Sequence, residues 1–146
     1  MKSIESLIVE KLNGHTFTIG PVAVSEPFSY KKPDLSVPAI IVQEIVNSPD
    51  MAKETHKEEY SNLVYQISVV ARTTVYEEAG VEKTKSPYQT VVELSMEVCD
   101  FLREEFMLSR MGDFVTRPYT SDNTVMERVF RVTAKYDLEH EILYRR

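Results

Sequence analysis

Residues 60–73 read YSNLVYQISVVART, and this stretch decides the fold. Apolar side chains recur at every second position, which is the period of a β-strand. The residues of the apolar face are Leu63, Tyr65, Ile67, Val69 and Ala71. The opposite face mixes apolar and polar side chains. The stretch therefore predicts a central strand with one face turned towards a hydrophobic core.

Further strands are predicted on both sides of this segment. Residues 39–47, AIIVQEIVN, are rich in β-branched side chains and predict a buried strand that pairs with 60–73 as a long hairpin. Residues 124–136 alternate again, and the inner face of that strand is predicted to carry Phe130, Val132, Ala134 and Tyr136.

Three shorter strands have weaker signals. Residues 15–19 alternate enough to predict a strand, and residues 22–24 predict an edge strand within the proline-rich segment 20–38. Residues 114–119 predict a strand at an edge or a bend, because Pro118 removes a ladder donor.

Two helices are predicted. Residues 3–12 form a short amphipathic helix, and Gly14 is placed to end it as a left-handed cap. The stronger signal starts at Ser86, an N-cap residue followed by Pro87 and by Gln89, which completes a capping box. This helix should end near 106–110. Its apolar stripe consists of Val91, Leu94, Val98, Phe101 and Leu102.

These elements predict an α+β fold in which an antiparallel sheet of four to five strands has two helices packed on one face. Residues 1–146 are predicted to form a single domain. The polar segments 48–59 and 77–85 are predicted to be mobile loops, and residues 137–146 a C-terminal tail.

Bulk composition excludes some classes of protein. The formal net charge of −6 argues against a general nucleic-acid binder, whose affinity rests on Lys and Arg at phosphates. No apolar run approaches the roughly 20 residues of a membrane helix, so no membrane partner is expected. The single cysteine, Cys99, allows no internal disulfide and fits a reducing compartment.

No catalytic, cofactor-binding or metal-binding motif is recognised. His15, His56 and His140 lack the spacing of a zinc site. Cys99 has no CxxC pattern and is interpreted as a small core side chain. The chain has too few glycines for a P-loop or dinucleotide fingerprint. We therefore expect no cofactor and no enzymatic activity.

Two segments offer candidate subunit contacts. Residues 50–59 form either a solvated hairpin tip or a set of charges that pairs with a neighbouring copy. Leu138, Ile142 and Tyr144 lie in the tail, which could add an edge strand, dock on a neighbouring subunit or stay loose. The candidate residues of the first segment are Lys53, Glu54, His56, Lys57, Glu58 and Glu59.

The order of the elements resembles that of the tail-terminator and tail-completion proteins of long-tailed bacteriophages. The segments that carry the resemblance are MKSIESLIVEKLNG (1–14), EYSNLVYQISVVAR (59–72), SPYQTVVELSMEVCDFLREEF (86–106) and ERVFRVTAKYDLEHEILYRR (127–146). Residues 59–67 also look like the E-Y-S-x-L-x-Y-Q-I style of central strand in that family. The resemblance covers nearly the whole chain and includes no catalytic motif.

The resemblance implies a structural role in the virion neck of a siphovirus. Subunits would form a hexameric ring that caps the tail tube and then joins the tail to the head connector. The implied partners are further copies of the chain, the tail tube protein and the head-completion or connector protein. Double-stranded DNA would pass through the ring without specific binding. Assembly would take place in the cytoplasm of the host bacterium.

Two other functions compete with this one. The chain could be another neck or minor capsid component of similar size, or a non-viral α+β binding domain. Rings or association with tubes favour the virion roles, whereas a persistent monomer with a ligand pocket favours the binding domain.

Overall fold

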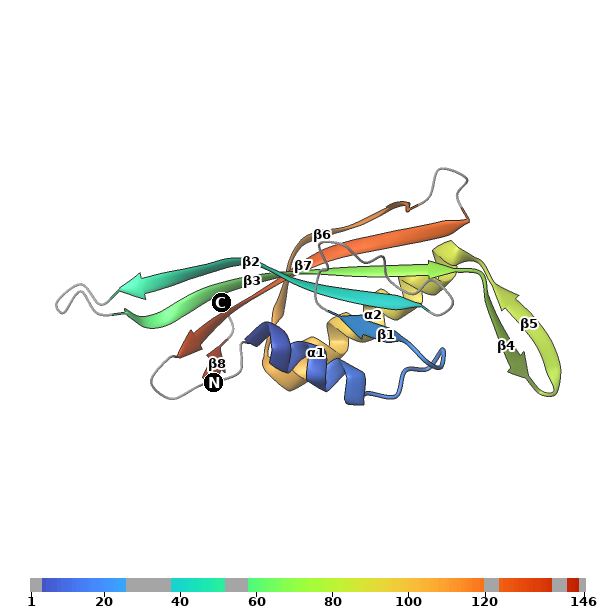
Figure 1. Ribbon diagram of the computed structural model, residues 1–146, viewed down its shortest axis with the longest axis horizontal. Helices are drawn as coiled ribbons and strands as arrows, with labels where there is room; N and C mark the ends of the chain where they lie inside the picture. The colour runs from blue at the N-terminus through green and yellow to red at the C-terminus, as the bar shows by residue number, and fades with distance from the viewer. Residues whose placement is uncertain (1–3, 26–37, 52–57, 120–123, 138–141, 145–146) are drawn as a thin grey trace.

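Figure 1 shows the computed structural model of the protein, which describes residues 4–25, 38–51, 58–119, 124–137 and 142–144. The helices are α1 (Ile4–Gly14) and α2 (Pro87–Phe106). The strands are β1 (Ala23–Ser25), β2 (Ala39–Met51), β3 (Glu58–Arg72), β4 (Thr74–Glu78), β5 (Val81–Lys85), β6 (Ser109–Pro118), β7 (Val125–Asp137) and β8 (Ile142–Tyr144).

The main sheet has the strand order β1-β2-β3-β7-β6, and β8 pairs with β7. The expected α+β class is confirmed. The sheet is mixed rather than wholly antiparallel, because β1 runs parallel to β2 while the other neighbours are antiparallel. With β8 it holds six strands, one more than predicted. The hairpin β4–β5 forms a separate two-stranded sheet.

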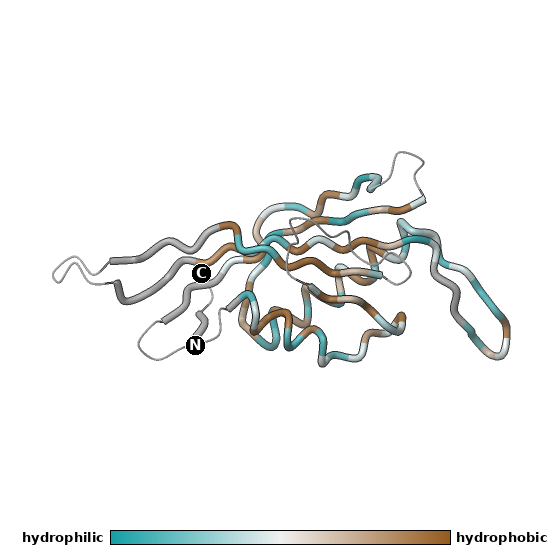
Figure 2. The backbone as a smooth tube through the Cα atoms, in the orientation of Figure 1, coloured by the Kyte–Doolittle hydropathy of each residue, from teal (hydrophilic) through white to brown (hydrophobic). Residues whose placement is uncertain are grey.

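Both helices pack on the same face of the main sheet, as predicted (Figure 1). Ile8 and Leu12 of α1 and Leu94 and Val98 of α2 belong to one buried cluster. The cluster includes the whole predicted inner face of β3, namely Leu63, Tyr65, Ile67, Val69 and Ala71. Figure 2 shows the hydrophobic residues gathered in the central strands and on the helices. The period-two pattern thus identified the core face correctly.

The start of α2 confirms the predicted N-cap at Ser86 and Pro87 at the first helical position, but the Gln89 side chain bonds to Glu93 and does not complete the predicted capping box. The Ser86 side chain accepts a hydrogen bond from the Gln89 backbone N–H at 3.1 Å, and Pro87 is the first helical residue. The Gln89 side chain donates to Glu93 Oε1 at 3.3 Å, one turn further along the helix. The helix ends at Phe106, and Met107 adopts the left-handed conformation with φ 55°.

The loop predicted at 48–59 is shorter than expected, because β2 continues to Met51 and β3 starts at Glu58. Pro49 pairs with Ser61 inside this extension. β1 borders β2 only as far as Ile41, so the outer edge of β2 is free of it at Pro49. Proline is tolerated at such an edge, where its missing N–H removes no ladder bond.

The segment 77–85 is a hairpin instead of the predicted loop. Glu78 pairs with Val81, so the turn consists of Ala79 and Gly80, whose φ values are 55° and 77°. Two positive φ values are typical of a type I′ turn, whose twist matches that of the flanking strands. The sequence concealed the strands because apolar residues do not alternate in either of them.

The strand predicted at 15–19 is a turn. The Gly20 backbone N–H donates to the Phe17 carbonyl oxygen at 3.1 Å, while the Phe17 ring is buried in the core. The edge of the sheet next to β2 is formed by β1 and not by residues 15–19. This confirms the edge strand predicted near 22–24. Gly14 ends α1 but is not among the glycines with positive φ, so the predicted left-handed cap was wrong.

β6 forms the far edge of the sheet, as predicted for the Pro118 strand, but it begins earlier, at Ser109. Its pairing with β7 breaks between Met111 and Val115. Gly112 lies in this irregular stretch with φ 75°, a conformation that favours glycine. The turn predicted at 120–123 lies outside the described residues.

Candidate interaction surfaces

The predicted interface residues that the structure describes fall at one end of the main sheet. Glu58 and Glu59 are the first residues of β3, and Ile142 and Tyr144 lie in β8. Lys53, Glu54, His56, Lys57 and Leu138 are outside the described part of the chain. The position of these five residues therefore stays a prediction.

The backbone of the two predicted segments converges at this end. Tyr60 of β3 pairs with Asp137 of β7, and Asp137 pairs on its other side with Ile142 of β8. The structure shows the first of the three alternatives for the tail at residues 142–144, which add a strand to the sheet. β8 takes the edge of β7 beyond Thr133, where its pairing with β6 ends. Segments from the middle and the end of the sequence thus lie at the same end of the sheet (Figure 1).

A groove lies on the helix-covered side of the core, between α2 and the turn that follows α1. It has a volume of about 520 Å³. The residues that line it include His15, Thr18, Lys85, Glu93 and Glu97. Asp100 and Glu104 continue the acidic row along α2. No pattern in the sequence indicates that Glu93 and Glu97 make contacts with distant segments.

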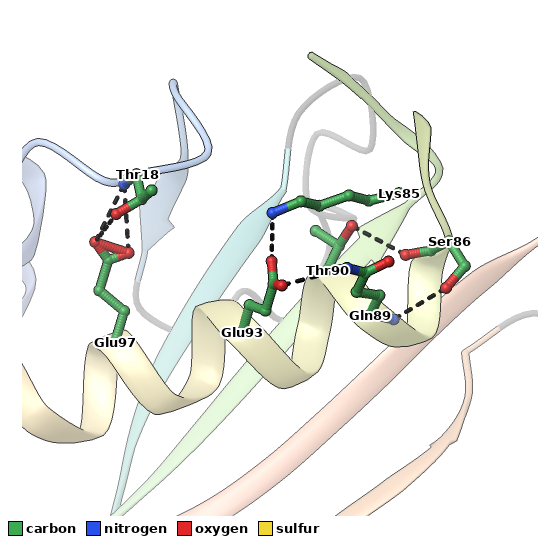
Figure 3. A network of polar contacts seen from close by, with 7 residues as sticks. All are labelled: Thr18, Lys85, Ser86, Gln89, Thr90, Glu93 and Glu97. Atoms are coloured by element: carbon green, nitrogen blue, oxygen red, sulfur yellow. Dashed lines mark hydrogen bonds and ion pairs between the residues drawn. The ribbon is translucent and has the colours of Figure 1, made fainter. Parts of the chain in front are cut away.

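Glu97 holds the 15–20 turn against α2 (Figure 3). Its Oε1 accepts hydrogen bonds from the Thr18 backbone N–H and from the Thr18 hydroxyl, both at 3.1 Å. The His15 Nε2 lies 3.6 Å from the same oxygen. The imidazole also packs edge-on against Phe17, with ring centroids 4.8 Å apart. No local sequence signal could have found this contact, because Thr18 and Glu97 are 79 residues apart.

Glu93 ties the end of β5 to α2 (Figure 3). Its carboxylate accepts hydrogen bonds from the Lys85 ammonium and from the Gln89 side chain. The hydrogen bond from Lys85 lowers the pKa of Glu93 below its usual value. Lys85 directly precedes the N-cap residue, so the ion pair fixes the direction in which the β4–β5 hairpin leaves the helix.

The groove residues bind one another, and none of these contacts assembles a reactive centre. Among the described residues, no group of three or more His, Cys, Asp or Glu side chains could hold a metal ion. Cys99 is half-buried and packs against the core, as its sequence context predicted. Burial raises the pKa of its thiol, and the nearby Asp100 adds to the shift. This favours the unreactive thiol over the thiolate.

The β4–β5 hairpin projects from the opposite end of the molecule to the β2–β3 tip (Figure 1). Among the described elements, β4 and β5 contact each other and have no substantial contact with the helices or the main sheet. Glu77, Glu78, Val81, Glu82 and Lys83 are all exposed. We call residues 74–85 the β4–β5 arm.

The sheet face away from the helices is covered only in part. Ala39, Val70 and Val125 form a small buried cluster there. Towards β6 the same face is open, and Met111 and Val115 keep 47% and 53% of their surfaces exposed. These values are high for apolar residues of paired strands, and they mark this part of the face as a candidate contact surface.

Comparison with protein-family models and with curated proteins gives no match to this chain. No helix in the described part of the chain is long and apolar enough to span a membrane. The assignment of a function therefore rests on the sequence pattern and on the geometry of the surfaces above.

Proposed function

We propose that this chain is a structural protein of the virion of a long-tailed bacteriophage. In this proposal it is a tail terminator, whose copies form a ring that caps the tail tube and joins it to the head connector. One observation carries the proposal: two β-hairpins project from opposite ends of a single packed core (Figure 1).

Projecting hairpins suit a ring subunit for a thermodynamic reason. An isolated two-stranded hairpin is marginally stable in water, so the β4–β5 arm, which has few contacts with the other described elements, can gain stability from a neighbour. Arms at opposite ends allow each subunit to contact two neighbours through different surfaces. Such heterologous contacts generate a ring when the rotation between subunits closes.

The element order and the charge also support the proposal. The order α1, strands, the long α2, then β6 and β7 is the one on which the resemblance to tail terminators rests. A net charge of −6 suits a ring around DNA, because like charge keeps the phosphates from adhering to the wall. These features support a channel role without specific DNA binding.

Electron microscopy tests the proposal directly. The purified chain is mixed with tubes assembled from the tail tube protein of the phage that encodes it. We expect a ring at one end of each tube. Tubes that stay bare at both ends in the presence of excess folded chain would overturn the proposal. Binding to the head connector but never to the tube would favour another neck component instead.

A second experiment tests the predicted interface at 52–57. Deleting residues 50–58 would also remove Asp50, Met51 and Glu58, which pair within β2 and β3. Replacing only 52–57 with a short Gly-Ser turn keeps those pairs. We expect tube joining to be lost while the far-UV circular dichroism is unchanged. The control variant, Glu104→Gln with Glu105→Gln on α2, should join normally. Joining by the 52–57 variant would reject the interface role of Lys53, Glu54, His56 and Lys57.

A further inference from the structure

The β4–β5 arm carries two acidic side chains that no basic residue in the described part of the chain balances. Glu77 and Glu82 are direct cross-strand partners. Opposed residues of an antiparallel pair have Cβ atoms about 5 Å apart, and like charges at that distance repel. Among the described residues, no cation forms an ion pair with either carboxylate. The two carboxylates are therefore available to a cation on another molecule.

The opposite face of the arm is already satisfied. Side chains alternate along each strand, so Glu78 and Lys83 lie on the face away from Glu77 and Glu82. Lys83 Nζ lies 3.1 Å from Glu78 Oε2. Only one face of the arm thus presents unpaired charge, which gives the arm a defined side for binding.

A groove with the complementary character lies on the open face of the main sheet. We call it the β6 groove; it has a volume of about 440 Å³. Its lining includes the exposed apolar residues Met111 and Val115 and the arginines Arg117 and Arg131, against one acid, Asp113. A hairpin laid across Met111 and Val115 would remove apolar surface from water.

Both arginines have N–H donors that can bind further carboxylate oxygens. Arg131 is exposed, and its Nε donates only to the neutral Gln66 Oε1, at 3.4 Å. Arg117 uses its Nε on Glu127 Oε1 at 2.8 Å, and its side chain remains 62% exposed. A guanidinium has five N–H donors in a planar fork, so further carboxylate oxygens can bind to each. The two carboxylates on one face of the arm are thus opposite in charge to the two arginines of the groove.

We propose that the β4–β5 arm of one copy docks in the β6 groove of a second copy, with Glu77 and Glu82 facing Arg131 and Arg117. The arm and the groove are different surfaces, so the contact is heterologous and leaves a free arm and a free groove at the ends of each assembly. This contact would join neighbouring subunits of the proposed ring. Only the closure of the ring rests on the proposed function. The pairwise contact needs only copies of this chain.

Charge reversal tests the contact. Self-association of the full chain is measured by analytical ultracentrifugation at low salt and at 0.5 M salt. We expect the average mass to rise with protein concentration at low salt and to fall at high salt, because the Debye length shortens. Glu77→Lys with Glu82→Lys, or Arg131→Glu alone, should weaken association about tenfold or more. Glu104→Lys with Glu105→Lys changes the charge equally on α2 and should associate like the natural chain.

Mixing the two reversed variants separates a specific contact from a general charge effect. The arm-reversed chain has a basic arm and a basic groove, and the Arg131→Glu chain has an acidic arm and a less basic groove. Neither associates well with itself, but each arm matches the other chain's groove. We expect the equimolar mixture to associate, and the triple variant to regain self-association. Failure of both rescues would overturn the proposal.

The remaining outcomes separate this inference from the proposed function. A chain that stays monomeric at several hundred micromolar and low salt overturns the docking proposal. If that monomer still caps tubes, and Arg131→Glu abolishes capping, the groove takes the tube protein and not a second copy. If arm-dependent association occurs but tubes stay bare, the docking proposal holds and the tail-terminator function fails. Unchanged circular dichroism of each variant shows that the fold is retained.

Discussion

Thr18 and Glu97 join the turn after α1 to the exposed flank of α2, with Glu97 Oε1 3.1 Å from both the backbone nitrogen and the hydroxyl oxygen of Thr18. The contact spans 79 residues of sequence. It holds the turn in place while Phe17 fills the core beneath it.

Glu97→Ala should therefore lower the free energy of unfolding by about 1–2 kcal/mol, since hydrogen bonds to a charged group are lost at a partly exposed site. Urea unfolding at neutral pH measures the change. Glu104→Ala, on the same helix, is the control and should change stability by less than about 0.5 kcal/mol. A double-mutant cycle with Thr18→Val should show coupling, and additive effects would contradict the assigned contact.

The Lys85–Glu93 ion pair predicts a pH-dependent contribution to stability. Lys85 lowers the pKa of Glu93 in the folded chain, so the contribution is complete above the unfolded pKa of about 4.3 and disappears as the pH falls through the folded pKa. The Glu93 side chain is 44% exposed, so solvent screening keeps the effect below about 1 kcal/mol.

The measurement compares urea unfolding of the natural chain and Glu93→Gln at pH 7 and pH 3. The difference in stability should shrink as the pH falls. Glu105→Gln, an exposed control on the same helix, should show a constant difference. A Glu93→Gln effect of equal size at both pH values would show that the ion pair contributes nothing specific.

The apolar stripe of α2 predicts opposite results at two neighbouring positions. Leu94 is 1% exposed in the core, whereas Met96 is 47% exposed. Leu94→Ala should cost about 2–5 kcal/mol through lost burial and a cavity. Met96→Ala should change stability by less than about 0.5 kcal/mol. Thermal and urea unfolding of both variants check the prediction, and similar losses at the two positions would mean that α2 packs with another face.

A substitution at Ala79 should change the local stability of the β4–β5 arm without changing the global stability of the protein. Its φ of 55° is costly for alanine and is adopted more readily by asparagine. Ala79→Asn should stabilise the β4–β5 arm by about 0.5–1 kcal/mol and slow amide hydrogen exchange in residues 74–85 a few-fold. The unfolding temperature should stay the same, because the arm has no substantial contact with another described element apart from the Lys85–Glu93 ion pair at its base.

Ala79→Val is the matched control, since a β-branched residue fits a positive φ poorly, and exchange in the arm should become faster. Unchanged exchange in both variants would contradict the type I′ turn.

The sequence by itself determined the central strand, its core face and the start of α2. Period two at 63–71 selects the buried side of β3, because a strand turns alternate side chains to opposite faces. Ser86 and Pro87 fix the start of α2 through local backbone chemistry, which needs no distant partner. These signals come from residues close in sequence, and the structure confirms them.

Only the tertiary structure decided the parallel pairing of β1, the Thr18–Glu97 contact, the β4–β5 arm and the pairing of β8. Residues 74–85 lack the alternation of apolar side chains by which strands are recognised. The β1–β2 pairing and the Thr18–Glu97 contact join segments that are distant along the chain. β8 is close to β7 in sequence, but its place depends on the edge of β7 that β6 leaves open beyond Thr133. Local propensity acts between neighbours in sequence, so the sequence shows it directly. The surfaces that could meet another subunit depend instead on which segments the folded core brings together.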